Sequence, residues 1–241
     1  MDRAALMDRR DTKYILNKEE FALILPELEK EYRVLVVDGH SISRYSSQYF
    51  DTSAFDFYHL HQRGKKNRVK IRIRRYDESN ISFLEVKLKT NTDRTVKSRI
   101  PTNEMRENLL GLEMDFIRHS TGVDLQLQPS VINGFRRITL VHKERAERIT
   151  FDLDISFSDA SGNYLTIPNL VIAELKQEKF DRSSIFARLT KNMLIRPESV
   201  SKYCLGVALL KVEVKKNAIK EKVRRIEELT SQQLLRYLQL T

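Results

Sequence analysis

The 241-residue sequence contains one cysteine, no tryptophan, seven glycines and five prolines. The single Cys204 excludes an internal disulfide framework and a zinc site made of several cysteines, and it favours a reducing compartment. The sequence has no Gly-rich loop, which excludes phosphate binding of the P-loop type. No apolar run approaches the ~18 residues of a membrane-spanning helix, and the N-terminus lacks the apolar core of a signal peptide. We therefore expect a cytoplasmic protein without a membrane anchor.

Positive charge dominates the composition. The sequence has 43 Lys and Arg residues against 33 Asp and Glu residues, which gives a net charge of +10 and a pI near 9.6. This balance favours a polyanionic partner and leaves nucleic acid, nucleotide, polyphosphate and anionic lipid open. The length allows one large β-rich domain with a substantial core. We expect this domain over residues 1–210, followed over residues 211–241 by amphipathic helices that cap it or contact a partner.

The most informative stretch runs from Asn67 to Asp77. In a β-strand, alternate side chains leave opposite faces, so this stretch would be cationic on one face and apolar on the other. A row of like charges is stabilised by a bound anion. The cationic face holds Arg68, Lys70, Arg72 and Arg74, and the apolar face holds Val69, Ile71 and Ile73.

Later segments repeat this alternation. The segment from Ser82 to Thr90 is expected to pair with the first strand as a hairpin. Further strand candidates carry cations in the same alternating positions, which predicts an antiparallel sheet with several charged rows. The clearest alternation places Arg148, Thr150, Asp152 and Asp154 opposite Ile149, Phe151, Leu153 and Ile155.

Such a sheet must pack its apolar face on other elements, and the expected helices are suitable covers. If the sheet closes on itself, the charged rows line one lumen, which suits a linear chain of phosphates. Carboxylates among the cations, such as Glu85, Asp152 and Glu174, suit a hard divalent ion that bridges phosphate oxygens. The alternative is a sheet with ordinary solvent-facing polar side chains, but the excess of Arg and Lys favours the lumen. Its cations would be Arg68, Lys70, Arg72, Arg74, Lys87, Lys97, Arg99, Arg137, Arg148 and Lys176.

Six motifs occur in an order that resembles a known family. They are Tyr49 to Thr52, Arg68 to Tyr76, Phe83 to Lys87, Arg148 to Asp152, Ala173 to Lys176 and Ser201 to Tyr203. From about Arg9 to Gly206 the sequence resembles the VTC domain, the polyphosphate polymerase branch of the triphosphate tunnel metalloenzymes in the CYTH-like superfamily. The resemblance implies an α+β fold, with a closed antiparallel eight-stranded β-tunnel and helices packed outside.

The resemblance also implies roles for particular residues. Glu174 would bind a divalent cation, Mn or Mg, and Ser201 with Lys202 would contact phosphate at the tunnel end. The charged rows add Lys97, Arg99 and Lys176 as substrate contacts and Glu85 as a second metal ligand. The triphosphate or growing chain would be held by Lys13, Arg72, Arg74, Lys87, Arg137 and Arg148, joined by Arg9.

In this family the terminal phosphate of ATP is transferred to a polyphosphate chain, and ADP is released. We therefore expect a phosphotransferase that binds ATP or inorganic triphosphate and polyphosphate, with a possible membrane-protein partner and no specific nucleic acid. Two alternatives remain open: a triphosphatase in the same site, and a non-catalytic binder of polyphosphate or RNA. Few aromatic residues lie within the basic rows, which argues against RNA. The oligomeric state stays open.

The sequence departs from the family at two places. Ser199 stands where the family has a lysine two residues before Ser201, which removes one cation. The Glu-x-Glu-x-Lys signature of the hydrolytic relatives is replaced by the segment from Arg9 to Lys13. The second departure argues against adenylate cyclase and thiamine triphosphatase activities.

Overall fold

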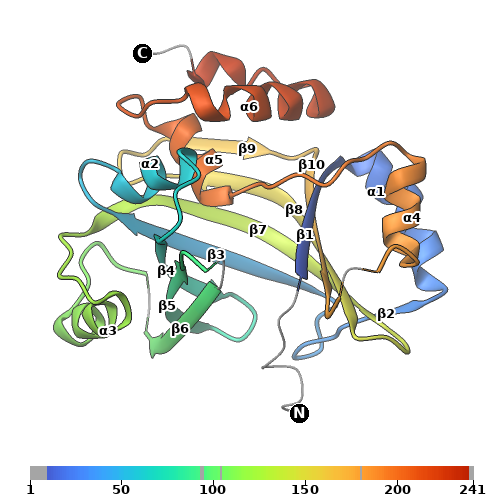
Figure 1. Ribbon diagram of the computed structural model, residues 1–241, viewed down its shortest axis with the longest axis horizontal. Helices are drawn as coiled ribbons and strands as arrows, with labels where there is room; N and C mark the ends of the chain where they lie inside the picture. Colours follow the sequence, from blue (N-terminus) through green and yellow to red (C-terminus); the bar gives the residue numbers. More distant parts are fainter. Residues whose placement is uncertain (1–9, 93–94, 104, 180, 239–241) are drawn as a thin grey trace. The chain divides into compact units, whose positions relative to one another are not determined.

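The computed structural model describes residues 10–92, 95–103, 105–179 and 181–238 (Figure 1). It confirms an α+β fold with an antiparallel sheet. Within the described ranges the sheet has ten strands. Eight of them follow the order β1 (Arg10–Asn17), β10 (Leu170–Gln177), β8 (Glu147–Ser158), β7 (Gln128–His142), β3 (Ile42–Asp51), β4 (Arg68–Tyr76), β5 (Ile81–Lys89) and β6 (Thr95–Thr102). The other two are β2 (Tyr32–Val34), which pairs with β7, and β9 (Tyr164–Ile167), which pairs with β8. The prediction of a closed eight-stranded tunnel is not confirmed, because the strand count differs and no described residues pair β1 with β6, the two ends of this order.

The chain divides into two compact units. Unit 1 comprises residues 1–43, 136–155 and 167–200, and unit 2 comprises residues 44–135, 156–166 and 201–241. Strands β7 (Gln128–His142) and β8 (Glu147–Ser158) contribute residues to both units. None of the helices in the described part of the chain has the length and apolar character that a membrane crossing requires.

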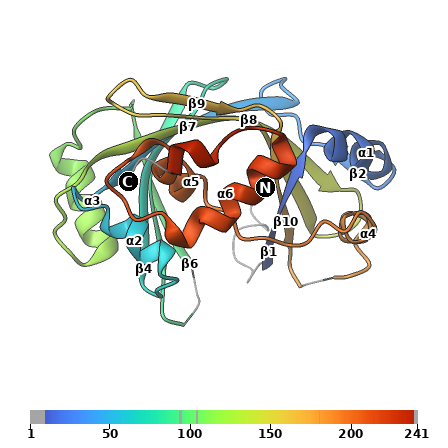
Figure 2. The ribbon, with the colours of Figure 1, turned by 90° about the horizontal axis from the view of Figure 1, so that it is seen from above.

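Unit 1 is built on β1 and β10, which pair with each other, and β10 pairs in turn with β8. Their apolar side chains form a core with two helices, which lie side by side in Figures 1 and 2. Phe21, Ile24 and Leu28 come from the first helix, and Ile185 and Phe186 come from the second. The elements are β1 (Arg10–Asn17), α1 (Lys18–Glu29), β2 (Tyr32–Val34), the start of β3 (Ile42–Asp51), β10 (Leu170–Gln177) and α4 (Ile185–Asn192).

Helix α1 begins directly after Asn17, a residue type that commonly caps the start of a helix. The side chain of Asn17 accepts from the backbone N–H of Glu20 at 2.8 Å, and the backbone N–H of Asn17 donates to the Glu20 carboxylate at 2.9 Å. This reciprocal capping box satisfies two N–H groups at the helix start. A proline inside a helix usually breaks or kinks it, but α1 runs through Pro26 to Glu29.

The alternation predicted for Arg148 to Ile155 holds up to Leu153 and fails at Asp154. Asp154 has φ +50°, a left-handed backbone conformation that interrupts the strand alternation. Its carboxylate accepts from Lys18 at 2.8 Å and also pairs with Arg136. Burial would raise the pKa of Asp154, but these two cations lower it. Asp154 therefore anchors α1 to β8 instead of continuing the polar row.

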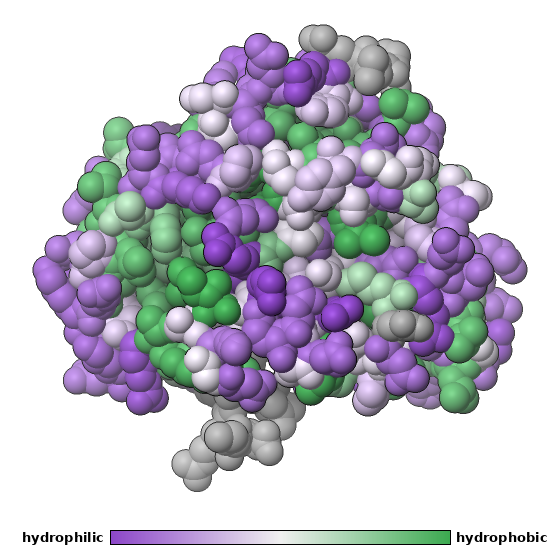
Figure 3. Space-filling model, turned by 180° about the vertical axis from the view of Figure 1, so that it is seen from behind, coloured by the Kyte–Doolittle hydropathy of each residue, from purple (hydrophilic) through white to green (hydrophobic). Residues whose placement is uncertain are grey.

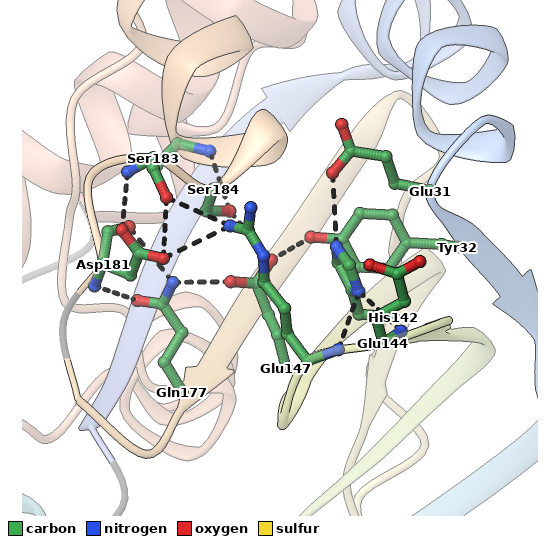
Figure 4. A network of polar contacts seen from close by, with 11 residues as sticks. Glu31, Tyr32, His142, Glu144, Glu147, Gln177, Asp181, Ser183 and Ser184 are labelled. Atoms are coloured by element: carbon green, nitrogen blue, oxygen red, sulfur yellow. Dashed lines mark hydrogen bonds and ion pairs between the residues drawn. The ribbon is translucent and has the colours of Figure 1, made fainter.

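A buried polar network around Glu147 ties β8 to its neighbours in unit 1 (Figure 4). The Glu147 carboxylate accepts from the Tyr32 hydroxyl, from the Gln177 amide at 2.6 Å and from the Ser184 hydroxyl at 2.8 Å. Burial raises the pKa of Glu147, and the negative charges of Asp181 and Glu31 act in the same direction. The side chains that donate to the Glu147 carboxylate are therefore all uncharged.

Unit 2 packs two helices on the apolar face of its strands. The core contains Ile71 and Ile73 of β4, Leu84 and Val86 of β5, and Ile117 of α3. The apolar parity predicted from the sequence is therefore the buried one. The elements are the remainder of β3, then α2 (Asp56–Gln62), β4 (Arg68–Tyr76), β5 (Ile81–Lys89), β6 (Thr95–Thr102), α3 (Gly111–Thr121), β9 (Tyr164–Ile167), α5 (Lys202–Leu210), α6 (Asn217–Thr230) and the 3₁₀ turn η1 (Leu235–Leu238).

Asp51, at the end of β3, joins three elements of unit 2. Its carboxylate accepts from the backbone N–H groups of Phe57 and Tyr58 at 3.0 Å each, and from the Tyr203 hydroxyl of α5. Asp51 thereby caps α2, whose own preceding residue offers no side-chain cap. Burial raises the pKa of Asp51, although all these donors act against that shift.

Large hydrophobic side chains also reach the surface. On the face drawn in Figure 3, hydrophobic areas interrupt a largely hydrophilic surface. Leu194 is 86% exposed and Leu112 is 83% exposed. Single exposed apolar side chains are common in folded proteins. Their backbone conformation and surroundings decide whether they indicate a binding surface.

Candidate functional site

The polar side of β4, β5 and β6 in unit 2 forms a cationic face. Strand pairing aligns Tyr49, Arg72, Glu85 and Arg99 in one row across β3, β4, β5 and β6. The Cβ atoms of directly opposite side chains in such a sheet lie about 5 Å apart. Among the described residues of these three strands, eight cations and one carboxylate share the face: Arg68, Lys70, Arg72, Arg74, Lys87, Lys89, Lys97 and Arg99 with Glu85.

Glu85 organises this face. Its carboxylate accepts from Arg72 Nε at 2.8 Å and from Lys97 Nζ at 2.5 Å, and only 1% of the residue is exposed. Burial would raise the pKa of Glu85, but Arg72, Arg74 and Lys97 hold it at about 2. Burial lowers the pKa of Lys97, and repulsion by Arg72 and Arg74 adds to this effect despite the contact with Glu85. Glu85 is therefore ionised at neutral pH and fixes the positions of Arg72 and Lys97.

Tyr49 shows how positive the surroundings are. Arg72 donates to its phenol oxygen at 3.1 Å, and the guanidinium carbon lies 5.8 Å from the ring centroid. Burial opposes ionisation of the phenol, yet the charges of Arg72, Arg74 and Lys70 lower the pKa of Tyr49 to about 8. An electrostatic environment that stabilises a phenolate also stabilises a phosphate oxygen.

Aromatic rings support several cations of unit 2. Arg74 donates to Ser47 Oγ at 3.2 Å and lies 5.7 Å from the ring of Tyr45 and 5.9 Å from that of Phe135. Tyr45 and Phe135 are themselves stacked, with centroids 5.2 Å apart. Such contacts fix the direction of a guanidinium without neutralising its charge. The same kind of contact joins Lys202 to Phe135 at 4.3 Å and Arg99 to Phe83 at 4.6 Å.

Ser201 connects the cationic face to helix α5. Its hydroxyl accepts from the backbone N–H of Cys204 at 3.3 Å, which makes it the N-cap of α5. Lys70 Nζ donates to the same oxygen at 3.0 Å. One hydroxyl thus caps a buried helix and positions a lysine of the cationic face.

The corresponding polar side of unit 1 carries charges of both signs, and we call it the mixed-charge face. Strand pairing aligns Lys13, Glu174 and Thr150 in one row across β1, β10 and β8. Glu174 Oε1 lies 3.4 Å from Lys176 Nζ and 4.0 Å from Lys13 Nζ, and Lys176 also contacts Asp11 at 2.9 Å. The charges of this face therefore largely balance one another.

Two further pairings complete the mixed-charge face. Arg137 donates to the Asp152 carboxylate in a bidentate pair, with distances of 2.6 and 2.8 Å. Arg148 lies opposite Lys176 in the neighbouring strand.

Lys13 donates to the carbonyl of Val200 at 3.4 Å, while its own carbonyl accepts from the N–H of Glu198 at 2.8 Å. The segment before α5 is thereby tied to β1.

Glu174 is the residue of this face that best fits a metal role. Its contacts with Lys13 and Lys176 are long, and the hydroxyl of Thr150 opposite it is buried without a hydrogen-bond partner in the described part of the chain. The described residues contain no group of three or more His, Cys, Asp and Glu that could hold a metal by themselves. Mg²⁺ is commonly bound by one or two carboxylates together with substrate phosphates, and Glu174 fits that mode.

The structure groups the predicted site residues into the two faces. Arg9 lies outside the described residues. The sequence analysis gave no site role to Tyr49 or Thr150, because their roles depend on which residues the strands bring opposite one another. The cationic face and its neighbours hold Arg72, Arg74, Glu85, Lys87, Lys97, Arg99, Ser201 and Lys202, and the mixed-charge face holds Lys13, Arg137, Arg148, Glu174 and Lys176.

Residues 8–211 match the family model of the VTC domain. The chain belongs to the VTC domain family. No curated protein sequence matches it. This VTC domain also shares the fold of a candidate adenylate cyclase from Bacillus halodurans, at 14% identity and a TM-score of 0.51, over 81% of this chain and 94% of the other.

Two other solved structures are similar to the VTC domain. A candidate adenylyl cyclase of Hippeastrum with a dominant triphosphatase activity is 14% identical, with a TM-score of 0.49 over 85% of this chain and 99% of the other. A candidate adenylate cyclase of Vibrio parahaemolyticus is 17% identical, with a TM-score of 0.45 over 82% of this chain and 97% of the other. Family membership supports a function that involves triphosphate or polyphosphate.

Proposed function

We propose that the chain is a metal-dependent polyphosphate polymerase that uses ATP. In this reaction an oxygen at the end of a polyphosphate chain bonds to the terminal phosphorus of ATP. The bond between that phosphorus and the bridging oxygen breaks, and ADP leaves with the electron pair. No protein nucleophile is needed, so positioning and charge stabilisation suffice.

The observation that carries the proposal is the excess of cations on the cationic face. Eight Lys and Arg side chains surround one carboxylate, and that carboxylate is already paired with Arg72 and Lys97. A polyanion with closely spaced charges supplies what this face lacks. Guanidinium groups bind phosphate oxygens in pairs, and lysines contribute point charges, so the face suits successive phosphates of one chain.

We assign phosphate binding to the cationic face, in particular to Arg72, Arg74 and Lys87. Lys13, Arg137 and Arg148 of the mixed-charge face are proposed as further phosphate contacts, and Glu174 as the ligand of Mn or Mg. When bound, the metal would neutralise charge on the transferred phosphate. The metal role predicted for Glu85 stays a prediction, and the contacts of Glu85 already give it a role in orienting Arg72 and Lys97.

The proposal is tested by incubating the protein with ATP and either Mn or Mg, and by resolving products by chain length. Long polyphosphate chains with stoichiometric ADP are the expected products. Free phosphate without chains would assign a triphosphatase, in which water attacks the same phosphorus. Neither product in either metal would contradict an enzymatic function and leave a polyphosphate binder.

Replacing Glu174 separates catalysis from binding. Glu174→Gln is expected to lower turnover by a factor on the order of 100 or more, because a Lewis acid contributes several kcal/mol to the transition state. Triphosphate binding measured without metal should stay within a few-fold of the unaltered protein. Glu178→Gln makes the same chemical change at an exposed position four residues on and serves as the control. Equal turnover in the two variants would contradict the role of Glu174.

A further inference from the structure

An unusual residue ends helix α4 in unit 1. The N–H of Leu194 donates to the carbonyl of Lys191 at 3.0 Å, and the N–H of Ile195 donates to that of Thr190 at 2.8 Å. This pattern closes a helix through a residue in the left-handed conformation, a place usually taken by glycine or asparagine. Leu194 occupies it with φ +59°. A leucine is unfavourable there relative to glycine, because its Cβ crowds the backbone.

Packing does not explain this leucine. Leu194 is the most exposed large hydrophobic side chain in the described part of the chain, at 86%. The fold buries almost none of the Leu194 side chain, so burial does not compensate for its unfavourable backbone conformation. Unfavourable backbone conformations that no packing compensates often occur at ligand-binding positions.

A cavity of about 530 Å³ lies next to Leu194. Pockets that hold small molecules or parts of larger ones commonly have volumes of about 300–1,000 Å³. Part of the wall is apolar and is formed by Ala187, Leu194, Ile195 and Pro197. The remaining lining carries no acidic residue among those that the structure describes. The cavity therefore offers an apolar surface beside positive charge.

Four cations surround this wall: Arg182, Arg188, Lys191 and Arg196. All four are exposed, and none has an ion pair with a described residue. Clusters of this kind attract the negative surface of a membrane, while an adjacent apolar side chain inserts below the headgroups. A free phosphate chain would need the cations and have no use for the apolar wall.

We propose that this surface, formed by the cavity, Leu194 and the four cations, binds the anionic face of a phospholipid membrane. Leu194 enters the lipid, and Arg182, Arg188, Lys191 and Arg196 contact the phosphates and acidic headgroups. The apolar wall covers hydrocarbon next to the headgroup. This function is separate from phosphate transfer and uses other residues of unit 1.

The test is sedimentation of the full chain with vesicles of phosphatidylcholine alone or mixed with phosphatidylglycerol. The unaltered protein should bind only the anionic vesicles. Arg188→Ala with Lys191→Ala should weaken binding by roughly 30-fold, since cations near such a surface contribute comparable increments. The control, Lys65→Ala with Lys220→Ala, removes the same charge at exposed positions elsewhere and should leave binding unchanged.

Leu194→Gly makes the test independent of misfolding. Glycine suits the left-handed position, so the melting temperature should rise. Vesicle binding should nevertheless fall by roughly tenfold, because an inserted apolar side chain is lost. The proposal is wrong if the unaltered protein does not bind anionic vesicles, or if Leu194→Gly binds them fully. It is also wrong if the variant with Arg188→Ala and Lys191→Ala binds as well as the control variant. Displacement from vesicles by an acidic peptide but not by soluble phosphatidylglycerol analogues would also overturn it and assign a protein partner.

Discussion

Unit 1 and unit 2 each expose a polar strand face, and the two faces balance charge differently. On the cationic face of unit 2, eight Lys and Arg side chains share one carboxylate, Glu85. On the mixed-charge face of unit 1, Lys176 contacts Asp11 and Glu174, and Arg137 forms a bidentate pair with Asp152. The strands of the first face contribute far more cations than carboxylates, whereas cations and carboxylates are closer to equal in number on the second.

A row of basic residues in the sequence therefore has different structural consequences in the two units. Where acids lie opposite the bases, the row stabilises the sheet and presents a carboxylate such as Glu174. Where they do not, the bases repel one another and a bound anion relieves the repulsion. Ligand-induced stabilisation should therefore come mainly from the cationic face.

The largest effect is expected from Arg72→Ala. The change leaves the buried Glu85 carboxylate with only part of its positive surroundings, so the free energy of unfolding should fall by about 3–5 kcal/mol. Triphosphate affinity should fall with it, because a phosphate contact is lost. Urea unfolding and titration calorimetry measure the two quantities.

A second substitution separates these two effects. Arg72→Ala combined with Glu85→Gln should recover most of the stability, since the buried carboxylate is removed, and should not recover triphosphate affinity. Recovery of both would show that Arg72 acts only through folding. The matched change in unit 1, Arg137→Ala with Asp152→Asn, asks whether a balanced pair also contributes to binding.

Two buried carboxylates should respond to acid in opposite ways. The pKa of Glu85 lies at about 2, below its ordinary 4.5, so its stabilising contribution is complete above pH 4.5. It should be lost between about pH 4.5 and 2, at a cost of about 3 kcal/mol. The pKa of Glu147 is raised by burial, so ionised Glu147 destabilises the fold, and this penalty should disappear as the pH falls through its raised pKa toward 4.5.

The pH slopes of stability in Glu85→Gln and Glu147→Gln measure this contrast. Glu85→Gln should flatten the loss of stability below pH 4.5. Glu147→Gln should remove a gain in stability that the unaltered protein shows on mild acidification. A change of slope in the same direction in both variants would contradict this prediction, which distinguishes a carboxylate held by cations from one held by uncharged donors.

The smallest effect concerns two helix caps, one in each unit. Ser201→Ala removes the cap of α5 and should lower the free energy of unfolding by about 1 kcal/mol. It should also weaken triphosphate binding a few-fold, because Lys70 loses its partner. Ser184→Ala removes the cap of α4 and a donor to the Glu147 carboxylate in unit 1, so it should lower stability without changing triphosphate affinity. An unchanged affinity in Ser201→Ala would show that the cap does not position Lys70.

Much of the strand architecture could be predicted from the sequence. Alternating residues such as Ile71 and Ile73 against Arg72 and Arg74 show which side is buried, because strand geometry turns successive side chains to opposite faces. The cap at Asn17 was also predictable, since Asn17 and Glu20 have the spacing of a capping box.

The rest depended on tertiary neighbours. Tyr49 has no local signal for its low pKa, which arises from Arg72, Arg74 and Lys70. Few aromatic residues occur within the basic rows, yet rings of Tyr45 and Phe135 reach Arg74 from other strands. This weakens the sequence argument against RNA. The break at Asp154 was not predictable either, because Lys18 and Arg136 hold its carboxylate only in the folded chain.

The buried carboxylate of Asp51 also bears on how the protein folds during synthesis. Its hydrogen bond to the Tyr203 hydroxyl joins residues 152 positions apart. Until Tyr203 has left the ribosome, this carboxylate can accept only from nearby backbone N–H groups such as those of Phe57 and Tyr58, and closing so long a loop is slow. The contact between β3 and α5 therefore forms only after β4, β5 and β6 have been synthesised.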